Sequence, residues 1–192
     1  MDLFNTNKTT HLLPAAGRLL IAEPFLGDDN FSRAVILLCE HNEEGSVGFV
    51  LNRPTQLILG DILENISQPS LPLYQGGPVQ MDTLHMLHRM QPSLGGVQIL
   101  PGIFWGGSYN ALQDVLAEDM FDAAHLKLFI GYSGWSSGQL MQEIKEGSWL
   151  VADAHPELLF DTHVEEIWKL AVRSLGNDFT FLSNMPIDPQ LN

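Results

Sequence analysis

Short apolar runs, separated by glycine, proline and polar residues, fill the first two thirds of the chain. Two of them, residues 33–41 and 46–52, are continuous and contain β-branched residues, which is typical of buried strands. The four polar residues between them end in Gly45, so they predict a β-hairpin turn. The other runs that have the length and composition of strands are residues 17–23, 72–75, 83–90, 97–100, 125–132 and 148–153.

Helical patterns are fewer and come mostly late in the chain. Residues 56–65 predict a short helix, and residues 108–119 place three apolar side chains on one helical face. Ser136 followed by Gln139 resembles a capping box, which predicts a helix over residues 136–146. Gly147 then closes that helix.

The clearest helical pattern covers residues 162–176. Thr162 and Glu165 form a second possible capping box, and Gly176 ends the pattern. Because strands follow one another in series and the helices come late, the order of elements favours an α+β fold over a repeated βαβ unit. Neither an internal repeat nor a low-complexity linker interrupts the chain. We therefore expect a single domain over residues 14–192, preceded by a loose leader of residues 1–13.

Composition limits the possible fold class and cellular location of the protein. Its 192 residues are 45% hydrophobic, which suits a globular fold. The longest clean apolar run, AVILLC, is far too short to span a membrane, and nothing resembles a secretory signal. The single cysteine, Cys39, excludes an intramolecular disulfide and suits a reducing cytosol. We expect a cytoplasmic protein that does not insert into membranes.

Charge argues against direct binding of nucleic acid. Nine Lys and Arg stand against 23 Asp and Glu, which gives a net charge of −14. The basic residues never cluster in the sequence, and an acidic surface repels the phosphate backbone. The partners that fit this chain are an unidentified protein or a small anionic ligand.

Few residues have the spacing that catalysis or metal binding needs. Cys39 and His41 share a strand face, which suits a thiol enzyme, but Cys39 also fits as a small apolar residue of a buried run. His85 and His88 point to opposite sides of a strand, and no third metal ligand lies near them in the sequence. Ser133 lies in GYSGW, which departs from the G-x-S-x-G nucleophile elbow. The sequence therefore predicts no catalytic residue, no metal and no cofactor.

The order of four segments resembles that of the YqgE/AlgH family of bacterial proteins. The segments are GRLLIAEPFLGDDNFSRAVILLCEHNEEGSVGFVLNRP, GGPV, GYSGWSSGQL and SWLVAD. The likeness runs from about residue 14 to the C-terminal MPIDPQLN. Recurring family positions are matched by Asp28, Phe31, Arg33, His41, Gly45, Gly48, Asn52, Arg53, Pro54, Gly76, Gly77, Pro78, Gly131, Tyr132, Gly134, Trp135, Gly138, Gln139 and Leu140.

This resemblance implies a single α+β domain in a cytosolic bacterial protein. Its mostly antiparallel sheet would be bent into a pseudo-barrel with a few flanking helices. The resemblance brings a transcriptional-regulator label that rests on genetic association, and it implies no catalytic residues. The family usually has Glu after Gly-Gln-Leu, where this chain has Met141, so Glu143 is the carboxylate that could substitute.

The predicted functional surface joins two loops and a strand end. Pairing of the hairpin brings Arg33 toward Asn52 and Arg53, where Asp28 or Asp29 can pair with one arginine and leave the other for an anion. The residues expected on this surface are Asp28, Arg33, Asn52, Arg53, Tyr132, Trp135 and Gln139. A structural ion pair at the base of the hairpin is the alternative.

Three classes of function remain open at this point. A non-enzymatic binding or regulatory module, acting indirectly in transcription, fits the sequence best. Direct DNA binding fits poorly because of the charge. An enzyme, for example a hydrolase with a cleft near Arg53 and residues 131–139, lacks a recognisable nucleophile and base.

Overall fold

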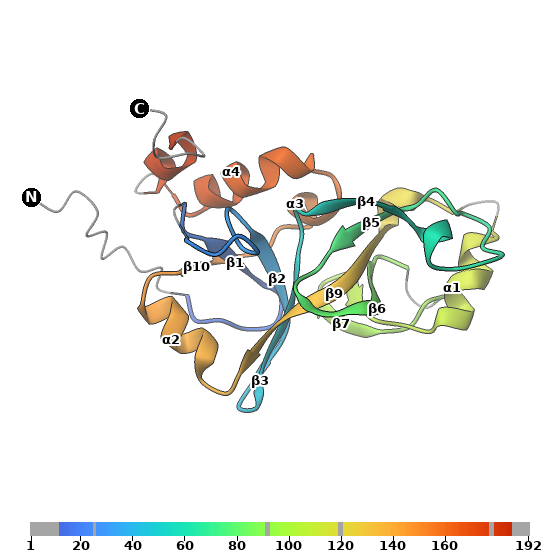
Figure 1. The fold of residues 1–192 in the computed structure, drawn as a ribbon, viewed down its shortest axis with the longest axis horizontal. Coiled ribbons are helices and arrows are strands. Elements are labelled where there is room, and N and C mark those ends of the chain that lie inside the picture. Colours follow the sequence, from blue (N-terminus) through green and yellow to red (C-terminus); the bar gives the residue numbers. More distant parts are fainter. Residues whose placement is uncertain (1–11, 25, 91–92, 119–120, 177–178, 186–192) are drawn as a thin grey trace, which may run out of the picture.

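The computed structural model describes residues 12–24, 26–90, 93–118, 121–176 and 179–185. Within them, ten strands form one bent sheet, whose main path runs β10-β1-β2-β3-β9-β6-β8-β7 (Figure 1). The strands are β1 (Arg18–Ala22), β2 (Val35–Asn42), β3 (Gly45–Val50), β4 (Pro54–Ile58), β5 (Pro72–Gln75), β6 (Val79–His88), β7 (Val97–Leu100), β8 (Ile103–Trp105), β9 (Leu126–Ser136) and β10 (Trp149–Asp153). In this described part, β10 and β7 are not paired with each other, so the sheet is not closed.

Among the described residues, four α-helices and three short 3₁₀ helices surround the sheet. They are α1 (Tyr109–Leu116), α2 (Gln139–Lys145), α3 (Pro156–Phe160), α4 (Val164–Ser174), η1 (Leu59–Asp61), η2 (Ala123–His125) and η3 (Thr180–Asn184). Figure 1 shows α2 and α4 beside one half of the sheet and α1 at the far end of the other. Strands in series with helices added late confirm the α+β class.

The central strand β9 joins two lobes. Through Leu126–Tyr132 it pairs antiparallel with β6, and through residues 128–130 it also pairs in parallel with β5. Beyond Tyr132 it pairs instead with β3. The change of partner bends the sheet near Gly131, which has a φ of 65°. We call β1, β2, β3, β10 and helices α2–α4 the first lobe, and β4–β8 with η1 and α1 the second lobe.

Alternation along the strands fills both faces of the first lobe. Leu19 and Leu37 face α3 and α4, in a core that also reaches Phe129 of β9. Leu20 and Ile36 face the opposite way, toward Leu140 of α2. The second lobe has its own apolar core between its strands and α1. Both faces of β1 and β2 are therefore covered, as their continuous apolar runs predict.

All eight predicted strands are confirmed, two with the predicted bounds and six with shifted ends. The hairpin is also confirmed: Asn42 pairs with Gly45 across a two-residue turn. Asn42 Oδ1 accepts hydrogen bonds from the backbone N–H groups of Glu44 and Gly45. The expected leader covers residues 1–13, of which 1–11 lie outside the described residues. Residues 186–192, the end of the C-terminal MPIDPQLN, also lie outside them.

The helix predicted over residues 56–65 is wrong. That segment begins in β4, passes through the single turn of η1 and ends in irregular turns over residues 62–65. The reason lies in its partner strand, because Pro54 and Ile58 pair with β5 and the Thr55 hydroxyl donates to Leu73 O at 2.7 Å. Sheet pairing thus overrides the local helical pattern. The sequence also failed to predict β8 and α3.

Both predicted capping boxes are misplaced. Ser136 ends β9, and Gly138, with a φ of 73°, is the N-cap of α2. His163 rather than Thr162 is the N-cap of α4, because the Thr162 hydroxyl donates to Glu157 O in α3. The Ser136 N–H does donate to Gln139 Oε1 at 3.0 Å, so the local contact exists one turn before the helix. No helix among the described residues has the length and apolarity to cross a membrane.

Candidate functional site

Asn52 joins the hairpin base to the loop that precedes β2. Its Oδ1 accepts the Val35 N–H at 3.0 Å, and its Nδ2 donates to Arg33 O at 2.9 Å. The hairpin therefore does bring Arg33 beside Asn52, as the sequence predicted. Both polar ends of the Asn52 amide are used on backbone groups, which makes the contact a structural anchor.

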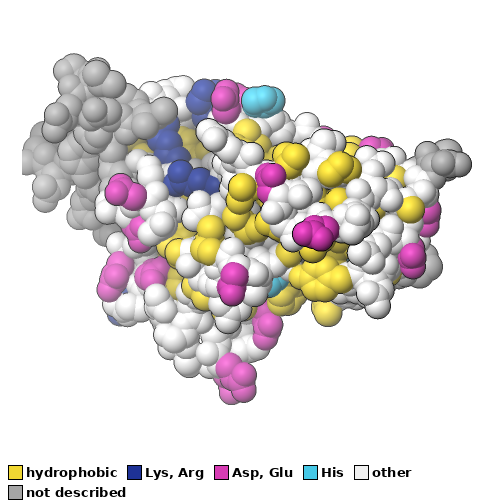
Figure 2. Space-filling model, turned by 45° about the vertical axis from the view of Figure 1, so that its right-hand side comes forward, with side chains coloured by type: hydrophobic (Ala, Val, Ile, Leu, Met, Phe, Trp, Pro, Cys, Tyr) yellow, Lys and Arg dark blue, Asp and Glu magenta, His cyan; other side chains and the backbone are white. Residues whose placement is uncertain are grey.

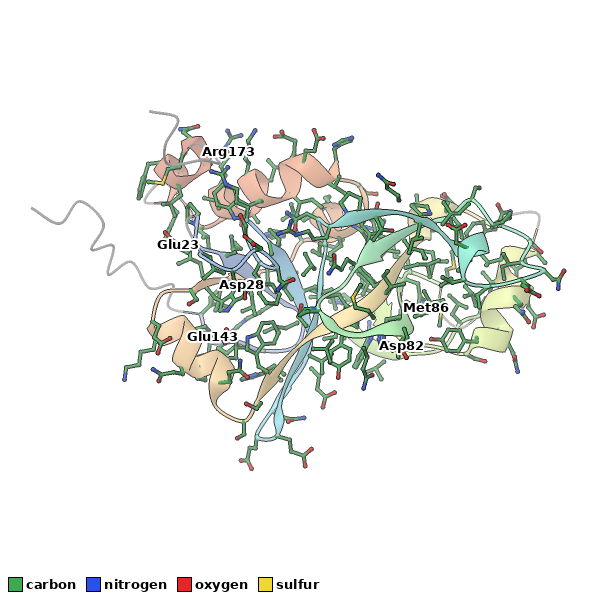
Figure 3. The ribbon with its side chains drawn as sticks, viewed as in Figure 1. Glu23, Asp28, Asp82, Met86, Glu143 and Arg173 are labelled. Atoms are coloured by element: carbon green, nitrogen blue, oxygen red, sulfur yellow. The ribbon has the colours of Figure 1, made fainter. Side chains whose placement is uncertain are left out.

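Arg53 holds the same loop a few residues earlier. Its Nη2 donates to Ser32 O at 2.8 Å and to Asp29 O at 3.4 Å. These acceptors are backbone carbonyls rather than the expected carboxylates. Asp28, placed in the loop between β1 and β2 (Figure 3), accepts from the Asn30 N–H through Oδ1 at 2.8 Å. Asp28 therefore stabilises its own turn.

Arg33 turns toward the helices of the first lobe. Its guanidinium lies 4.6 Å from the ring centroid of Trp168 on α4 and donates through Nη2 to Met185 O at 2.6 Å. Burial lowers the pKa of the Arg33 guanidinium. Trp168 packs on one face of β1 and β2, whereas Trp135 packs on the other. The structure thus separates the Arg33 side chain from Trp135.

A carboxylate on α2, Glu143, organises the opposite face (Figure 3). Its Oε2 accepts the indole N–H groups of Trp135 at 2.9 Å and Trp149 at 2.8 Å. Its Oε1 accepts from Gln139 Nε2 at 2.9 Å. Met141, by contrast, is exposed. Glu143 therefore provides a carboxylate beside Trp135 and Gln139 despite the Met141 substitution.

Phe31 connects the loop before β2 to this network. Its ring stacks on Trp135 at a centroid distance of 6.5 Å and meets the edge of Trp149 at 5.4 Å. The predicted meeting of the loop with the 131–139 segment therefore occurs, but through an aromatic side chain. The sequence did not place Phe31 on the predicted surface, because the contacts expected there were between charged and amide side chains.

Tyr132 and Trp135 line a hollow of about 400 Å³ beside the hairpin. Glu40 and Glu44 supply acidic groups at its wall. The rings of Tyr132 and His85 also form a T-shaped contact at a centroid distance of 5.8 Å. Two of the seven expected residues thus share a concave surface, while the grouping of all seven on one ligand surface stays a prediction.

The residues considered as nucleophiles or metal ligands have structural environments. Cys39 is buried, and its burial raises the pKa of the thiol, as expected for a core residue. Ser133 is fully buried and donates to Gly76 O at 3.0 Å. His88 is fully buried against Gly106 O at 3.0 Å, and burial lowers its pKa. Across the described residues, no three His, Cys, Asp or Glu side chains are placed to hold a metal ion.

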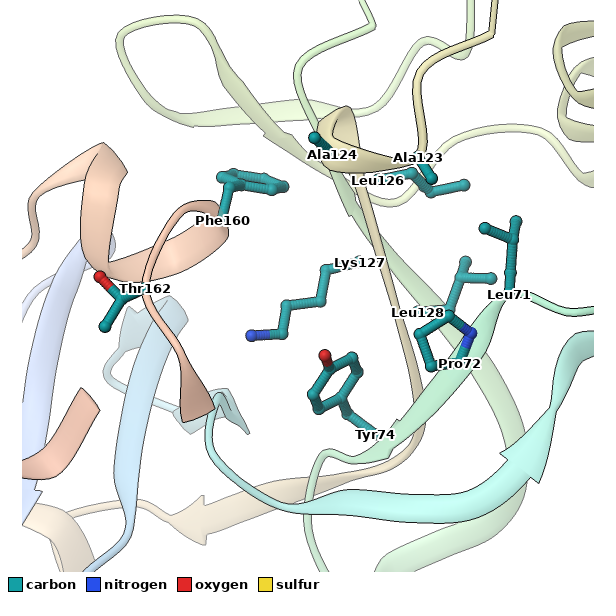
Figure 4. A pocket seen from close by; sticks show the side chains of 10 residues that line it. All are labelled: Leu71, Pro72, Tyr74, Ala123, Ala124, Leu126, Lys127, Leu128, Phe160 and Thr162. Carbon is teal, nitrogen blue, oxygen red and sulfur yellow. The ribbon is translucent and has the colours of Figure 1, made fainter. Parts of the chain in front are cut away.

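A buried lysine was missed by the sequence reasoning. Lys127 on β9 is only 7% exposed and lines a pocket of about 280 Å³ with Tyr74 and Phe160 (Figure 4). Burial lowers the pKa of its ammonium to about 8. The available signal was Lys127 itself, between Leu126 and Leu128 in an otherwise apolar strand.

The second lobe carries an apolar hollow of about 450 Å³ between η1, β6 and α1. Ile62, Met81 and Tyr109 line it and are 41%, 42% and 51% exposed. Residues 80–83 bulge out of the β6–β9 pairing, which lifts Met81 to the surface. A Cβ on Gly131 would lie 2.8 Å from the Met81 sulfur, so the glycine gives this side chain its room.

These features define an α+β protein with a bent, open sheet, two lobes and several surface hollows. The AlgH-like family model matches residues 19–180. A UPF0301 protein of Chlorobaculum tepidum is 42% identical over 97% of this chain and 100% of its own length. The chain therefore belongs to the AlgH-like family.

Two solved structures share this fold. The solution structure of the AlgH protein from Pseudomonas aeruginosa has a TM-score of 0.72 at 31% identity, covering 93% of this chain and 98% of that one. A crystal structure of a Corynebacterium diphtheriae protein has a TM-score of 0.75 at 22% identity, covering 93% and 96%. The latter likeness shows the fold alone.

Proposed function

We propose that this chain is a non-enzymatic binding and regulatory module that acts through a partner protein. The observation that carries the proposal is the hollow of the second lobe, where Ile62, Met81 and Tyr109 expose apolar surface together. Clustered apolar side chains on a soluble protein mark interaction surfaces more often than single ones do. Figure 2 displays hydrophobic side chains gathered on this part of the molecule.

Charge favours a particular kind of partner. The exposed Asp82 lines the hollow, and the exposed Asp61 and Glu64 flank its lining residues Ile62 and Leu63 in the chain. Arg89 is the only Lys or Arg between positions 54 and 118. An apolar centre with an acidic rim complements a protein segment whose apolar residues are flanked by Lys or Arg. A second copy of this acidic chain would add like charges to the contact. We therefore assign a basic, amphipathic segment of another protein as the occupant.

A protein that regulates transcription through a docked partner needs no direct contact with DNA, so this proposal is compatible with the family's transcriptional-regulator label. The excess of 23 acidic over nine basic residues opposes binding to the phosphate backbone. The buried states of Cys39 and Ser133 give an enzyme no exposed nucleophile at those two positions. A cytosolic location forms part of this proposal.

The test is quantitative partner capture with matched variants. Met81→Asp places a charge in the hollow, and Val97→Asp places one at a 63% exposed apolar position on β7 that does not line it. We expect Met81→Asp to lower partner retention by about tenfold or more, since an apolar contact is replaced by a desolvated charge. Val97→Asp should retain the partner as the unchanged protein does.

Two further outcomes bear on the proposal. Raising the salt concentration should weaken retention, because the acidic rim is exposed and therefore screened. Equal retention of the same protein by both variants and the unchanged chain would refute docking in this hollow. Circular dichroism and thermal unfolding establish that both variants remain folded, so a lost signal reports the surface.

A further inference from the structure

Lys127 occupies a position where a charge is costly. It lies on β9 between the buried Leu126 and Leu128, and its own side chain is only 7% exposed. An ammonium in such surroundings needs a compensating partner. In the part of the chain that the structure describes, the Lys127 Nζ donates one hydrogen bond, to Leu159 O at 3.4 Å.

The remaining contact of the ammonium is with an aromatic ring. Nζ lies 4.4 Å from the ring centroid of Tyr74, which gives a cation–π interaction. An ammonium has three N–H donors, so a single long bond to a carbonyl leaves two for another acceptor. The nearby charged side chains pair with each other: Arg89 forms an ion pair with Asp161 at 3.3 Å and donates a hydrogen bond to Pro156 O.

The lysine opens on a pocket rather than on packed side chains. The pocket has a volume of about 280 Å³ and is lined by Leu71, Leu126, Leu128 and Phe160 besides the polar residues Lys127, Tyr74 and Thr162. Figure 4 shows the Lys127 side chain and the Tyr74 hydroxyl turned toward the same space. This volume is close to the lower limit of ligand pockets, roughly 300 Å³, so the occupant is small.

We propose that this pocket binds a small organic monocarboxylate, with its carboxylate at the Lys127 ammonium and its hydrocarbon part against the leucines and Phe160. One cation compensates one negative charge, whereas a phosphate dianion would leave a buried charge unbalanced. The apolar lining selects an acyl or aryl group over a polar one. Tyr74 offers a hydroxyl that can donate to the second carboxylate oxygen.

The site is independent of the partner-docking hollow. Its lining comes mainly from β5, η2, β9, the end of α3 and the α3–α4 connection, and it shares no lining residue with the hollow at Met81. The competing explanation is that Lys127 only stabilises the C-terminal end of α3, through Leu159 O. Such a role would not select among small molecules.

Isothermal titration with hexanoate, hexanamide and inorganic phosphate separates these accounts. Hexanoate should bind at least about tenfold more tightly than hexanamide, because only the carboxylate makes a charge-assisted bond with the ammonium. Lys127→Met, which keeps the length and apolar stem, should reduce hexanoate affinity by about tenfold or more and leave hexanamide unaffected. Lys145→Met on the exposed side of α2 is the matched control and should bind hexanoate normally.

A second variant keeps the test valid if Lys127→Met alters the fold. Tyr74→Phe removes only the hydroxyl and should weaken hexanoate binding by about threefold, while hexanamide changes less. The proposal is overturned if hexanoate and hexanamide bind alike, if phosphate binds more tightly than hexanoate, or if hexanoate shows no saturable binding. Unchanged hexanoate affinity in Lys127→Met would equally refute it.

Discussion

The charged groups near the two ends of β9, the half-buried Glu143 and the buried Lys127, have opposite hydrogen-bonding environments. Beyond the C-terminal end, the Glu143 carboxylate accepts hydrogen bonds from Trp135, Trp149 and Gln139. Near the N-terminal end, Lys127 has one carbonyl at 3.4 Å and the face of Tyr74. Strand β9 therefore carries an under-coordinated cation near one end and contacts, through Trp135, a well-coordinated anion on α2 at the other.

The difference separates a structural group from a candidate binding group. A carboxylate with three donors contributes fixed geometry, and it holds α2 against β9 and β10. A cation that retains unused donors beside a pocket keeps its capacity for a ligand and costs stability until that ligand arrives. We therefore expect the aromatic cluster of the first lobe to have a structural role, whereas the proposed binding sites lie at the Met81 hollow and the Lys127 pocket.

The largest effect that tests this comparison is loss of the Glu143 carboxylate. Glu143→Ala leaves two indole N–H groups and one amide without their acceptor. We expect the free energy of unfolding to fall by about 3 kcal/mol, since each buried unpaired donor costs about 1–3 kcal/mol and water reaches some of them. Urea denaturation at neutral pH measures the change.

Glu146→Ala is the matched control on the neighbouring turn. Glu146 is exposed and its carboxylate accepts from Gln142 Nε2, so the loss should be about 0.3–0.5 kcal/mol. Similar losses in the two variants would show that Glu143 is no more important than a surface carboxylate. The proposed structural role of the Glu143 carboxylate would then be refuted.

The next effect has the opposite sign. Lys127→Met removes a buried ammonium whose pKa burial lowers from 10.5 to about 8. A difference of that size corresponds to roughly 3 kcal/mol of disfavoured charge, offset in part by the lost contacts with Leu159 O and Tyr74. We expect the variant to be more stable than the unchanged protein by about 2 kcal/mol at pH 7.

The pH dependence of this gain follows from the lowered pKa. Below about pH 8 Lys127 is charged in both the folded and unfolded states, so the full cost of burial is present. Between about pH 8 and 10.5 the folded state loses its proton first, so the unchanged protein becomes more stable relative to Lys127→Met. Urea denaturation of both proteins from pH 6 to 10 checks it; a constant difference would contradict a charged, buried Lys127.

The fold was largely predictable because its strands are continuous apolar runs bounded by turn residues. Residues 72–75 and 97–100 were predicted with the bounds that β5 and β7 have. The segment after Pro54 was not, because its conformation depends on pairing with β5 and on the Thr55 contact with Leu73. Such long-range pairing leaves no local pattern.

The site was less predictable for a similar reason. Sequence spacing brought Arg33 to Asn52 correctly, but the direction of the Arg33 side chain depends on Trp168, 135 residues later. Lys127 looked like one more scattered basic residue, since its burial depends on β5 and on the end of α3. Composition can count charges but does not tell which of them folding removes from water.

The smallest effect concerns Arg53. It distinguishes a structural role of the loop before β2 from a role in ligand binding. Arg53→Ala removes the bonds to Ser32 O and Asp29 O at a partly exposed position, so stability should fall by about 1 kcal/mol. Because Phe31 still packs on Trp135 and Trp149, the loop should keep its attachment at the aromatic cluster. Thermal unfolding, together with partner capture per folded molecule, measures both consequences. Lower stability with unchanged capture identifies a structural anchor, whereas lost capture at an unchanged melting temperature would place the ligand surface at the hairpin base.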